Sequence, residues 1–371
     1  MHIQVLRGPF LSTLAQIQGV IEAKRTLPIL SHLLLEAKEN TISISGTDLD
    51  VSIRTTLDGD VKNEGRVAVS GKKLYEIARE LPDTSIDLRW QEPQNLEIIC
   101  AKSVFRLKGA APEEFPAFPE IAEGTGITVN AETLRGIISK VLFAVSTDQT
   151  RPTLTGALLQ ITASDLRIVA TDGHRLSLVT TSFDSAKDQE KDQDMLEAII
   201  PRKALVELGK MLKDESGEIR LIPLGHQMGF LLPQSRLISR LIEGQFPNYE
   251  QVLPSPSGPG AVVHREDFLG ALRRTSTIAG DRATPTVLDL RGGRLLISCT
   301  NVDLGEAKEE LSMDYQGPEV TVGFNAKYLL DFLGVVERTE VEMRIQDPLS
   351  PAVFEPAKGE GFSCVIMPMR I

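Results

Sequence analysis

The stretch VATDGHRLSLV, residues 169–179, places an aspartate, a glycine, a histidine and an arginine side by side at positions 172–175. Asp172 and His174 could be a general base and its orienting partner, with a nearby Thr or Ser as nucleophile. Alternatively, these residues form a turn between two strands, in which Asp172 accepts hydrogen bonds from local backbone and Gly173 takes a positive φ. The turn is favoured, because catalytic triads are assembled across a fold and not within four consecutive residues.

The same kind of stretch occurs three times along the chain. It reads GTDLDVSI at 46–53, ATDGHRLSLV at 170–179 and CTNVDLGEAKEEL at 299–311, each time after an apolar run typical of a strand. A helix-like segment precedes each copy, and a short strand and a second helix-like segment follow it. Asp48 lies 124 positions before Asp172, which lies 129 positions before Asn301. A unit of domain size therefore recurs, too long for the repeat of a solenoid.

The pattern within each unit predicts an α+β fold with antiparallel sheet. Runs such as IDLRW (86–90) and VEMRIQ (341–346) alternate apolar and polar residues. Phe-Pro segments at 113–121 and 244–254 each close a unit, which places the linkers near residues 122 and 254. The expected domains are residues 1–122, 123–254 and 255–371, and three similar domains in a row suggest pseudo-rotational symmetry.

Composition indicates a globular protein of the cytoplasm. Hydrophobic residues make up 42% of the 371 positions and charged residues 25%. Cys100, Cys299 and Cys364 lie far apart and form no CxxC pair, which indicates neither a zinc ribbon nor a disulfide framework. The N-terminus has no signal-peptide pattern, and no stretch approaches the 18 apolar residues of a membrane span. We therefore expect a reduced protein with no membrane contact.

The charge distribution leaves nucleic acid open as a partner. The net charge of -11 argues against it, because phosphate contacts come from Lys and Arg. The helix-like segments nevertheless carry more basic than acidic residues, so the excess of acidic residues lies in the rest of the chain. Either the basic residues of these helices form a shared surface that faces a polyanion, or they lie on ordinary solvent-exposed helix faces and form i,i+4 ion pairs.

An enzyme is the rival class of function. GRVAVSGKK (65–73) fails as a phosphate-binding loop, because Ser70 stands where GxxxxGK[ST] needs its second Gly and Lys73 replaces the hydroxyl residue. The histidines form no HxH or HxxxH pair, so no metal site is predicted. No motif for a cofactor is found either, and we expect none.

The repeat and seven stretches, two of which belong to it, resemble the bacterial DNA polymerase III β subunit family, the replicative sliding clamps, over essentially the whole chain. The stretches are LPILSHLLLEA (27–37), GTDLD (46–50), VATDGHRL (169–176), IPRKALVEL (200–208), FPNYEQVLP (246–254), GFNAKYLLDFL (323–333) and VIMPMRI (365–371). The resemblance implies three clamp domains per chain and a ring-shaped head-to-tail homodimer, with antiparallel sheets outside and helices lining the inside. It also implies a non-catalytic protein that encircles double-stranded DNA and tethers the replicative polymerase for processivity. The implied partners are the clamp loader, replicative and other DNA polymerases, and repair proteins.

The resemblance also implies site residues, carried over position by position. A groove between domains 2 and 3 that binds short linear peptides would contain Leu154, Thr171, Gly173, His174, Arg175, Leu176, Pro247, Val252, Asn325, Tyr328, Val365, Met367, Pro368, Met369 and Arg370. The expected DNA contacts are Lys24, Lys72 and Gln149, to which Arg202 and Lys203 are added from their place on a second helix. The expected dimer edge joins Phe105 and Leu107 of one chain to Thr277 and Ile278 of the other.

This chain departs from the family pattern at a few positions. Gln251 stands where some relatives have Arg, and Leu349 and Pro351 occupy a pocket edge that is more often Val and Ser. Pro152 and Thr153 replace two adjacent tyrosines, which argues against stacking on an exposed base. A peptide-binding adaptor that never encircles DNA is the alternative function, since a fold alone does not exclude it.

Overall fold

The computed structural model describes residues 1–21, 27–91, 95–121, 126–182, 196–253, 259–280, 284–359 and 361–371. The chain forms two compact units. Unit 1 comprises Met1–Arg135 and Lys203–Leu241, and unit 2 comprises Gly136–Arg202 and Ile242–Ile371. The predicted domain boundaries near residues 122 and 254 fall outside the described residues and stay predictions.

One order of elements recurs three times along the chain: a strand and a helix, then four strands, a second helix and three strands, with one extra strand in the first copy. The first copy has β1 (His2–Leu6), α1 (Arg7–Ile17), β2 (His32–Lys38), β3 (Thr41–Thr47), β4 (Val51–Leu57), β5 (Asp60–Asn63), β6 (Gly65–Ser70), α2 (Gly71–Glu80), β7 (Ser85–Gln91), β8 (Asn95–Cys100) and β9 (Ser103–Ala110). The second has β10 (Ile127–Asn130), α3 (Ala131–Val141), β11 (Gly156–Ile161), β12 (Asp165–Thr171), β13 (Arg175–Ser182), β14 (Leu196–Pro201), α4 (Arg202–Met211), β15 (Glu218–Leu224), β16 (Gln227–Leu231) and β17 (Ser235–Arg240). The third has β18 (Ala261–His264), α5 (Arg265–Ser276), β19 (Thr286–Arg291), β20 (Arg294–Asn301), β21 (Gly305–Ser312), β22 (Val320–Phe324), α6 (Ala326–Val335), β23 (Glu340–Arg344), β24 (Ala352–Pro356) and β25 (Phe362–Ile366).

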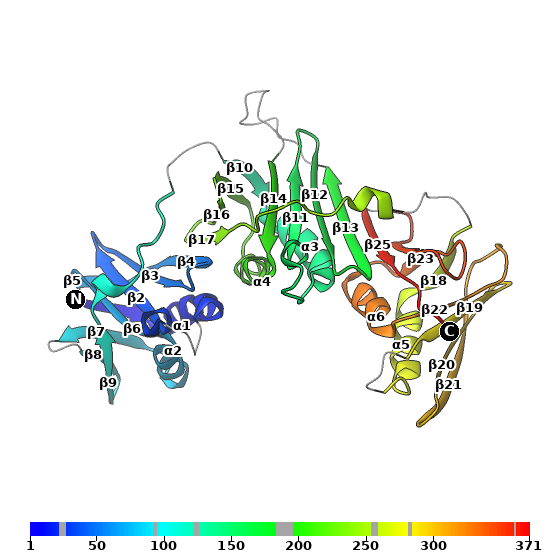
Figure 1. Ribbon diagram of the computed structural model, residues 1–371. Helices are drawn as coiled ribbons and strands as arrows, with labels where there is room; N and C mark the ends of the chain where they lie inside the picture. Colours follow the sequence, from blue (N-terminus) through cyan, green and yellow to red (C-terminus); the bar gives the residue numbers. More distant parts are fainter. Residues whose placement is uncertain are drawn as a thin grey trace. The chain divides into compact units, whose positions relative to one another are not determined.

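In unit 1 the strands form one sheet in the order β10-β15-β16-β17-β4-β3-β2-β6-β9-β8-β7-β1-β5. Helices α1 and α2 lie side by side and pack on its β2–β4 and β6 region (Figure 1). Side chains alternate between the two faces of a strand, and this explains the packing. Ile53 and Thr55 of β4 are buried on the helix side, while Arg54 and Thr56 point to the opposite face. The sheet therefore has one face covered by helices and one polar face.

In unit 2 the strands form an eight-stranded sheet, β14-β11-β12-β13-β25-β24-β23-β18, and a four-stranded sheet, β21-β20-β19-β22. Helices α5 and α6 lie against each other (Figure 1). Phe332 of α6 packs on the rings of Phe354 and Phe362, with centroids 6.1 Å and 5.4 Å away. These aromatic contacts attach the helix to β24 and β25.

The helix ends follow from local chemistry. The side chain of Asn325 accepts a hydrogen bond from the backbone N–H of Lys327 (3.0 Å), which caps α6. In α2 the positions spaced for one face, Leu74 and Ala78, are buried, whereas Lys72 and Lys73 are exposed. All strand pairs recorded for the described residues are antiparallel, so the predicted α+β fold with repeated units and antiparallel sheets is confirmed.

Candidate functional site

The ATDGH stretch is a turn, as its local chemistry predicts. Asp172 Oδ1 accepts hydrogen bonds from the backbone N–H groups of His174 (2.9 Å) and Arg175 (3.0 Å). Gly173 has φ +90°, and β12 ends at Thr171 just before it. The carboxylate of Asp172 is thus engaged by backbone and by Arg175, and its bond to His174 reaches the backbone N–H rather than the imidazole. The general-base interpretation is therefore not supported.

Both other repeats have the same pair of hydrogen bonds from backbone to side chain. Asp48 Oδ1 accepts from the N–H groups two and three residues ahead, at 2.9 Å and 2.7 Å. Asn301 Oδ1 does the same, at 2.9 Å and 3.2 Å. Asp and Asn thus accept the same pair of backbone hydrogen bonds in all three stretches. The residue after the Asp or Asn takes a positive φ in the first two, at Leu49 (78°) and Gly173 (90°), but not at Val302 in the third.

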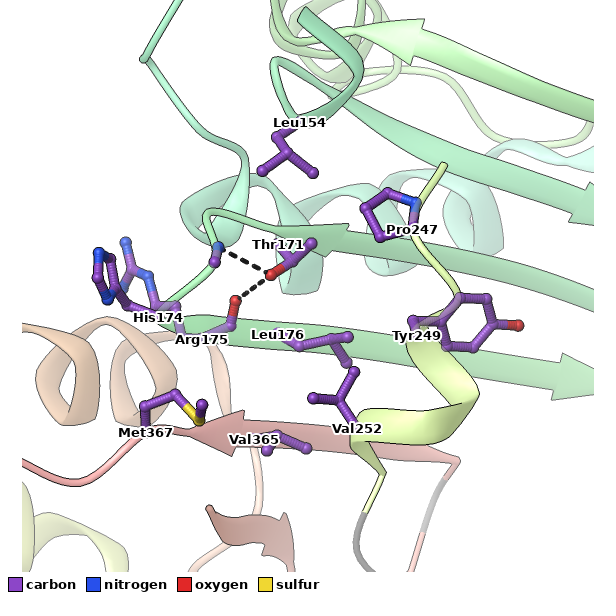
Figure 2. Close-up of a pocket in the computed structure, with 11 residues that line it drawn as sticks. Leu154, Thr171, His174, Arg175, Leu176, Pro247, Tyr249, Val252, Val365 and Met367 are labelled. Carbon is purple, nitrogen blue, oxygen red and sulfur yellow. Dashed lines mark hydrogen bonds between the residues drawn. The ribbon is translucent and has the colours of Figure 1, made fainter. Parts of the chain in front are cut away.

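Further hydrogen bonds stabilise the turn, whose residues line a pocket. Thr171 Oγ1 donates to the carbonyl of Arg175 (2.7 Å) and accepts from the N–H of Gly173 (3.1 Å), as the dashed lines in Figure 2 show. The carbonyl of His174 accepts a hydrogen bond from the N–H of Met367 (2.9 Å). These bonds join the turn to the chain just beyond β25.

Arg175 anchors the turn from inside the protein. Its side chain is 7% exposed, its Nε lies 3.0 Å from Asp172 Oδ2, and its Nη1 lies 2.7 Å from Asp331 Oδ2 of α6. Its guanidinium stacks 4.4 Å from the ring centroid of Tyr328 and also donates to the carbonyl of Phe143. The guanidinium therefore has several partners within the chain, which hold the turn in place.

The pocket itself is a cavity of about 170 Å³ in unit 2. It is lined by Leu154, Thr171, Gly173, His174, Arg175, Leu176, Pro247, Tyr249, Val252, Val365 and Met367. Figure 2 shows the labelled side chains surrounding one space, with Val365 and Met367 opposite Leu154. Leu176, Tyr249 and Val365 belong to a buried cluster beneath it, so the pocket has an apolar and packed floor.

Tyr249 is a lining residue that the sequence analysis missed. Its side chain is buried, and its hydroxyl accepts from Arg167 Nη1 (2.9 Å) and donates to Gln160 Oε1 (2.9 Å). The hydroxyl points away from the other lining side chains in Figure 2, so the ring alone faces the pocket. The sequence held one signal for it: Tyr249 lies in the stretch FPNYEQVLP, between the expected groove residues Pro247 and Val252.

Five residues of the expected groove lie outside the pocket lining. Asn325 and Tyr328 belong to the start of α6, and the ring of Tyr328 stacks on the guanidinium of Arg175. Met369 pairs with Gly323 through its backbone N–H (2.8 Å), and its neighbours Pro368 and Arg370 lie on the same terminal segment. Burial raises the pKa of the Tyr328 phenol, and the charge of Asp172 raises it further.

Among the departures from the family pattern, Leu349 is 82% exposed. Like Gln251 and Pro351, it does not line the described pocket.

The residues expected to contact DNA differ in their surroundings. Lys24 lies outside the described residues. Lys72, Gln149 and Arg202 are exposed. Lys203 is different, because its Nζ lies 2.6 Å from Oδ2 of Asp48, whose side chain is 2% exposed. This ion pair gives Lys203 a structural role that the sequence did not reveal.

Two of the residues expected at the dimer edge, Phe105 and Leu107, lie on β9, whose outer edge is largely without a partner strand among the described residues. β9 pairs with β8 along Ser103–Lys108 but with β6 only at Gly109 and Ala110. Val104 is 57% and Phe105 38% exposed on this edge, and Leu107 is half-buried. Thr277 and Ile278 follow α5, a helix that packs on β20 and β21.

The described residues hold no group of three or more His, Cys, Asp or Glu side chains arranged to bind a metal ion. All three cysteines are free and buried. None of the helices seen in the described ranges combines the length and apolar composition needed to span a bilayer.

Comparison with known proteins gives a consistent result over the whole chain. Models of the DNA polymerase III beta subunit match residues 1–119 (N-terminal domain), 128–248 (central domain) and 250–370 (C-terminal domain). The chain is 34% identical to the beta sliding clamp of Pseudomonas aeruginosa and 31% to that of Caulobacter vibrioides, and each alignment covers 100% of both proteins.

Solved structures agree. The DNA polymerase III subunit beta from Pseudomonas aeruginosa matches with a TM-score of 0.91 at 33% identity over 100% of both chains. The DNA polymerase sliding clamp from Bacillus subtilis matches with a TM-score of 0.93 at 26% identity, over 100% of this chain and 99% of that one. The chain therefore belongs to the DNA polymerase III beta subunit family, the sliding clamps, which are non-catalytic processivity factors.

Proposed function

We propose that two copies of this chain associate head to tail into a ring around duplex DNA, in the cytoplasm, and tether the replicative polymerase to its template. Membership in the sliding-clamp family supports this proposal, since a clamp acts by encircling DNA and holding a polymerase there. The peptide-binding adaptor that never meets DNA is not favoured by that membership.

The observation that carries the ring is the pair of unpaired strand edges. In unit 1, the edge of β9 from Ser103 to Lys108 has no partner strand among the described residues. In unit 2, β21 is the end strand of its sheet, and within the described ranges its one partner is β20. Exposed edges favour pairing with another chain, and two different edges favour head-to-tail contacts that can close into a ring.

The charges on these edges are complementary. β9 carries Arg106 and Lys108, whereas β21 carries three glutamates and one lysine in the run GEAKEELS. Attraction between them would favour β9 against β21 over β9 against β9, because like charges directly opposite one another destabilise a strand pair. Phe105 and Leu107 would add apolar area to the same contact.

The helices provide a surface suited to DNA. Each of the six α-helices in the described ranges carries at least as many basic as acidic residues, in a chain with a net charge of -11. Exposed Lys72 and Arg202 are the DNA contacts we favour, and exposed Gln149 is a third. A weakly basic inner surface would let the ring slide, because retention then depends on topology and not on tight phosphate binding.

We further propose that the apolar pocket of unit 2 binds short linear peptides from the clamp loader, DNA polymerases and repair proteins. Leu176, Val365 and Met367 offer an apolar lining, and Met adapts its shape to different side chains. Polar backbone of the turn at the rim can receive the peptide main chain, as in other small pockets with a few placed polar groups.

The test is processive synthesis on primed circular DNA by the cognate polymerase and clamp loader. We expect long products from a single binding event only when the chain is present. A variant with Phe105→Glu should remain folded but give short products, because a carboxylate on β9 would face the glutamates of β21 and oppose closure. Long products from this variant would contradict the ring.

A further inference from the structure

A second cavity lies in unit 1, on the sheet face opposite α1. Its volume is about 330 Å³, and it is lined by Thr41, Ser43, Arg54, Thr56, Leu231, Leu232, Pro233, Gln234, Ser235 and Arg236. It forms where β17 pairs with β4, and β3, β4, β17 and the end of β16 with its turn into β17 supply its walls. Nothing in the proposed ring or peptide pocket uses this cavity.

Two arginines face each other across its strand pair. Arg236 of β17 is directly opposite Arg54 of β4 in the antiparallel register. Like charges in this arrangement repel and destabilise a sheet unless an anion separates them. Burial lowers the pKa of the Arg54 guanidinium, and the charges of Arg236 and Arg66 lower it further, although Glu36 opposes them.

Among the described residues, one carboxylate, that of Glu36, forms ion pairs with this group of arginines. Glu36 lies 3.3 Å from Arg54 Nη2 and 2.9 Å from Arg66 Nε. The guanidinium of Arg236 has no ion pair or hydrogen bond with any other described residue. Three guanidinium groups and one carboxylate leave a local charge of about +2.

Arg54 is held in place with donors to spare. Its Nε donates to Ser45 Oγ (2.9 Å), its Nη2 donates to Glu36, and the ring of Phe118 lies with its centroid 4.4 Å from Cζ. A guanidinium has five N–H donors. Within the described part of the chain, the donors of Nη1 have no acceptor, so the group is fixed but not satisfied.

We propose that this cavity binds the phosphate group of a small ligand. A phosphate dianion matches the local charge, and its oxygens accept from several directions. The lining offers guanidinium groups from β4 and β17 and hydroxyls from β3 and β4, whereas a planar carboxylate is satisfied by a single guanidinium fork. Leu231 and Pro233 add an apolar wall that suits the organic part of a phosphate monoester.

The test is isothermal titration calorimetry of the full chain at about pH 8, where a phosphate monoester is a dianion, with ionic strength held constant. The probes are inorganic phosphate, AMP and adenosine. We expect saturable binding of AMP and phosphate and none of adenosine. Tighter binding of AMP would identify a monoester as the source of the phosphate group, and equal binding would identify the free ion.

Two variants make the test specific. Arg236→Gln, an exposed change, should weaken AMP binding by at least about tenfold, because it removes a charged donor. Arg240→Gln is the matched control, since Arg240 is exposed on the same strand and does not line the cavity. Both variants should keep the oligomeric mass in solution and the peptide affinity of the wild type. A failure of the phosphate proposal can therefore be told apart from a failure of the clamp proposal. Absence of binding, binding of adenosine, or equal weakening by both variants would overturn the proposal.

Discussion

Met367→Ala tests the peptide pocket at a wall that contributes little to folding. Met367 lines the cavity and is 41% exposed, so a bound peptide would cover the part that water now reaches. Fully burying a Met side chain is worth about 1.5–3 kcal/mol, and the exposed share scales this to about 0.6–1.2 kcal/mol. The variant should therefore bind a clamp-binding peptide about threefold to eightfold more weakly.

Fluorescence polarisation with a labelled peptide from a polymerase clamp-binding motif measures this change. Val302→Ala is the control, because Val302 is a 96% exposed apolar residue outside the pocket. The control should bind as the wild type does. Wild-type affinity in Met367→Ala, or equal weakening in Val302→Ala, would refute the assignment of the pocket.

Three further predictions concern the pocket support, the dimer edge and the cysteines. Tyr249→Phe keeps the ring in the pocket but removes the hydroxyl that hydrogen-bonds to both Arg167 and Gln160. This variant should have a lower Tm in calorimetry, while its peptide affinity changes less than about twofold. An unchanged Tm would argue against a stabilising role of these two hydrogen bonds. Leu107→Asp combined with Ile278→Asp should give folded monomers in light scattering, because two carboxylates would be buried unpaired at the edge contact; a dimer that survives at micromolar concentration is the contrary result. Burial raises the pKa of the Cys364 thiol, and it is also the main cause of the raised pKa values of Cys100 and Cys299. At about pH 8 the thiols therefore stay protonated, and a thiol reagent should label the native chain far more slowly than the unfolded one. Rapid labelling of the native chain would contradict the burial of the cysteines.

The sequence predicted local features well because short-range chemistry determines them. The Asp172 turn was identifiable since the side chain bonds to backbone only two and three residues ahead. The same rule extends to Asp48 and Asn301, which allowed the repeat to be recognised. Much of the pocket lining followed from a resemblance that covers the whole chain.

Long-range pairings could not be predicted in this way. The ion pair between Lys203 and Asp48 joins residues 155 positions apart, and nothing near either residue signals it. Tyr249 has partners 82 and 89 positions away, so its role in supporting the pocket depends on the register of the folded sheet. The cavity beside Arg54 likewise exists only because β17 pairs with β4.

The central claim, that the protein encircles DNA, is tested most directly by comparing retention on circular and linear DNA. The ring is loaded onto nicked circular DNA by a clamp loader with ATP and passed through gel filtration at high salt. Binding by surface phosphate contacts alone would weaken by about 10³- to 10⁵-fold between about 50 and 200 mM salt, whereas a ring held by topology stays on the circle. We predict that the protein coelutes with the circle and is released when one cut makes the DNA linear. Equal retention before and after the cut would contradict encirclement.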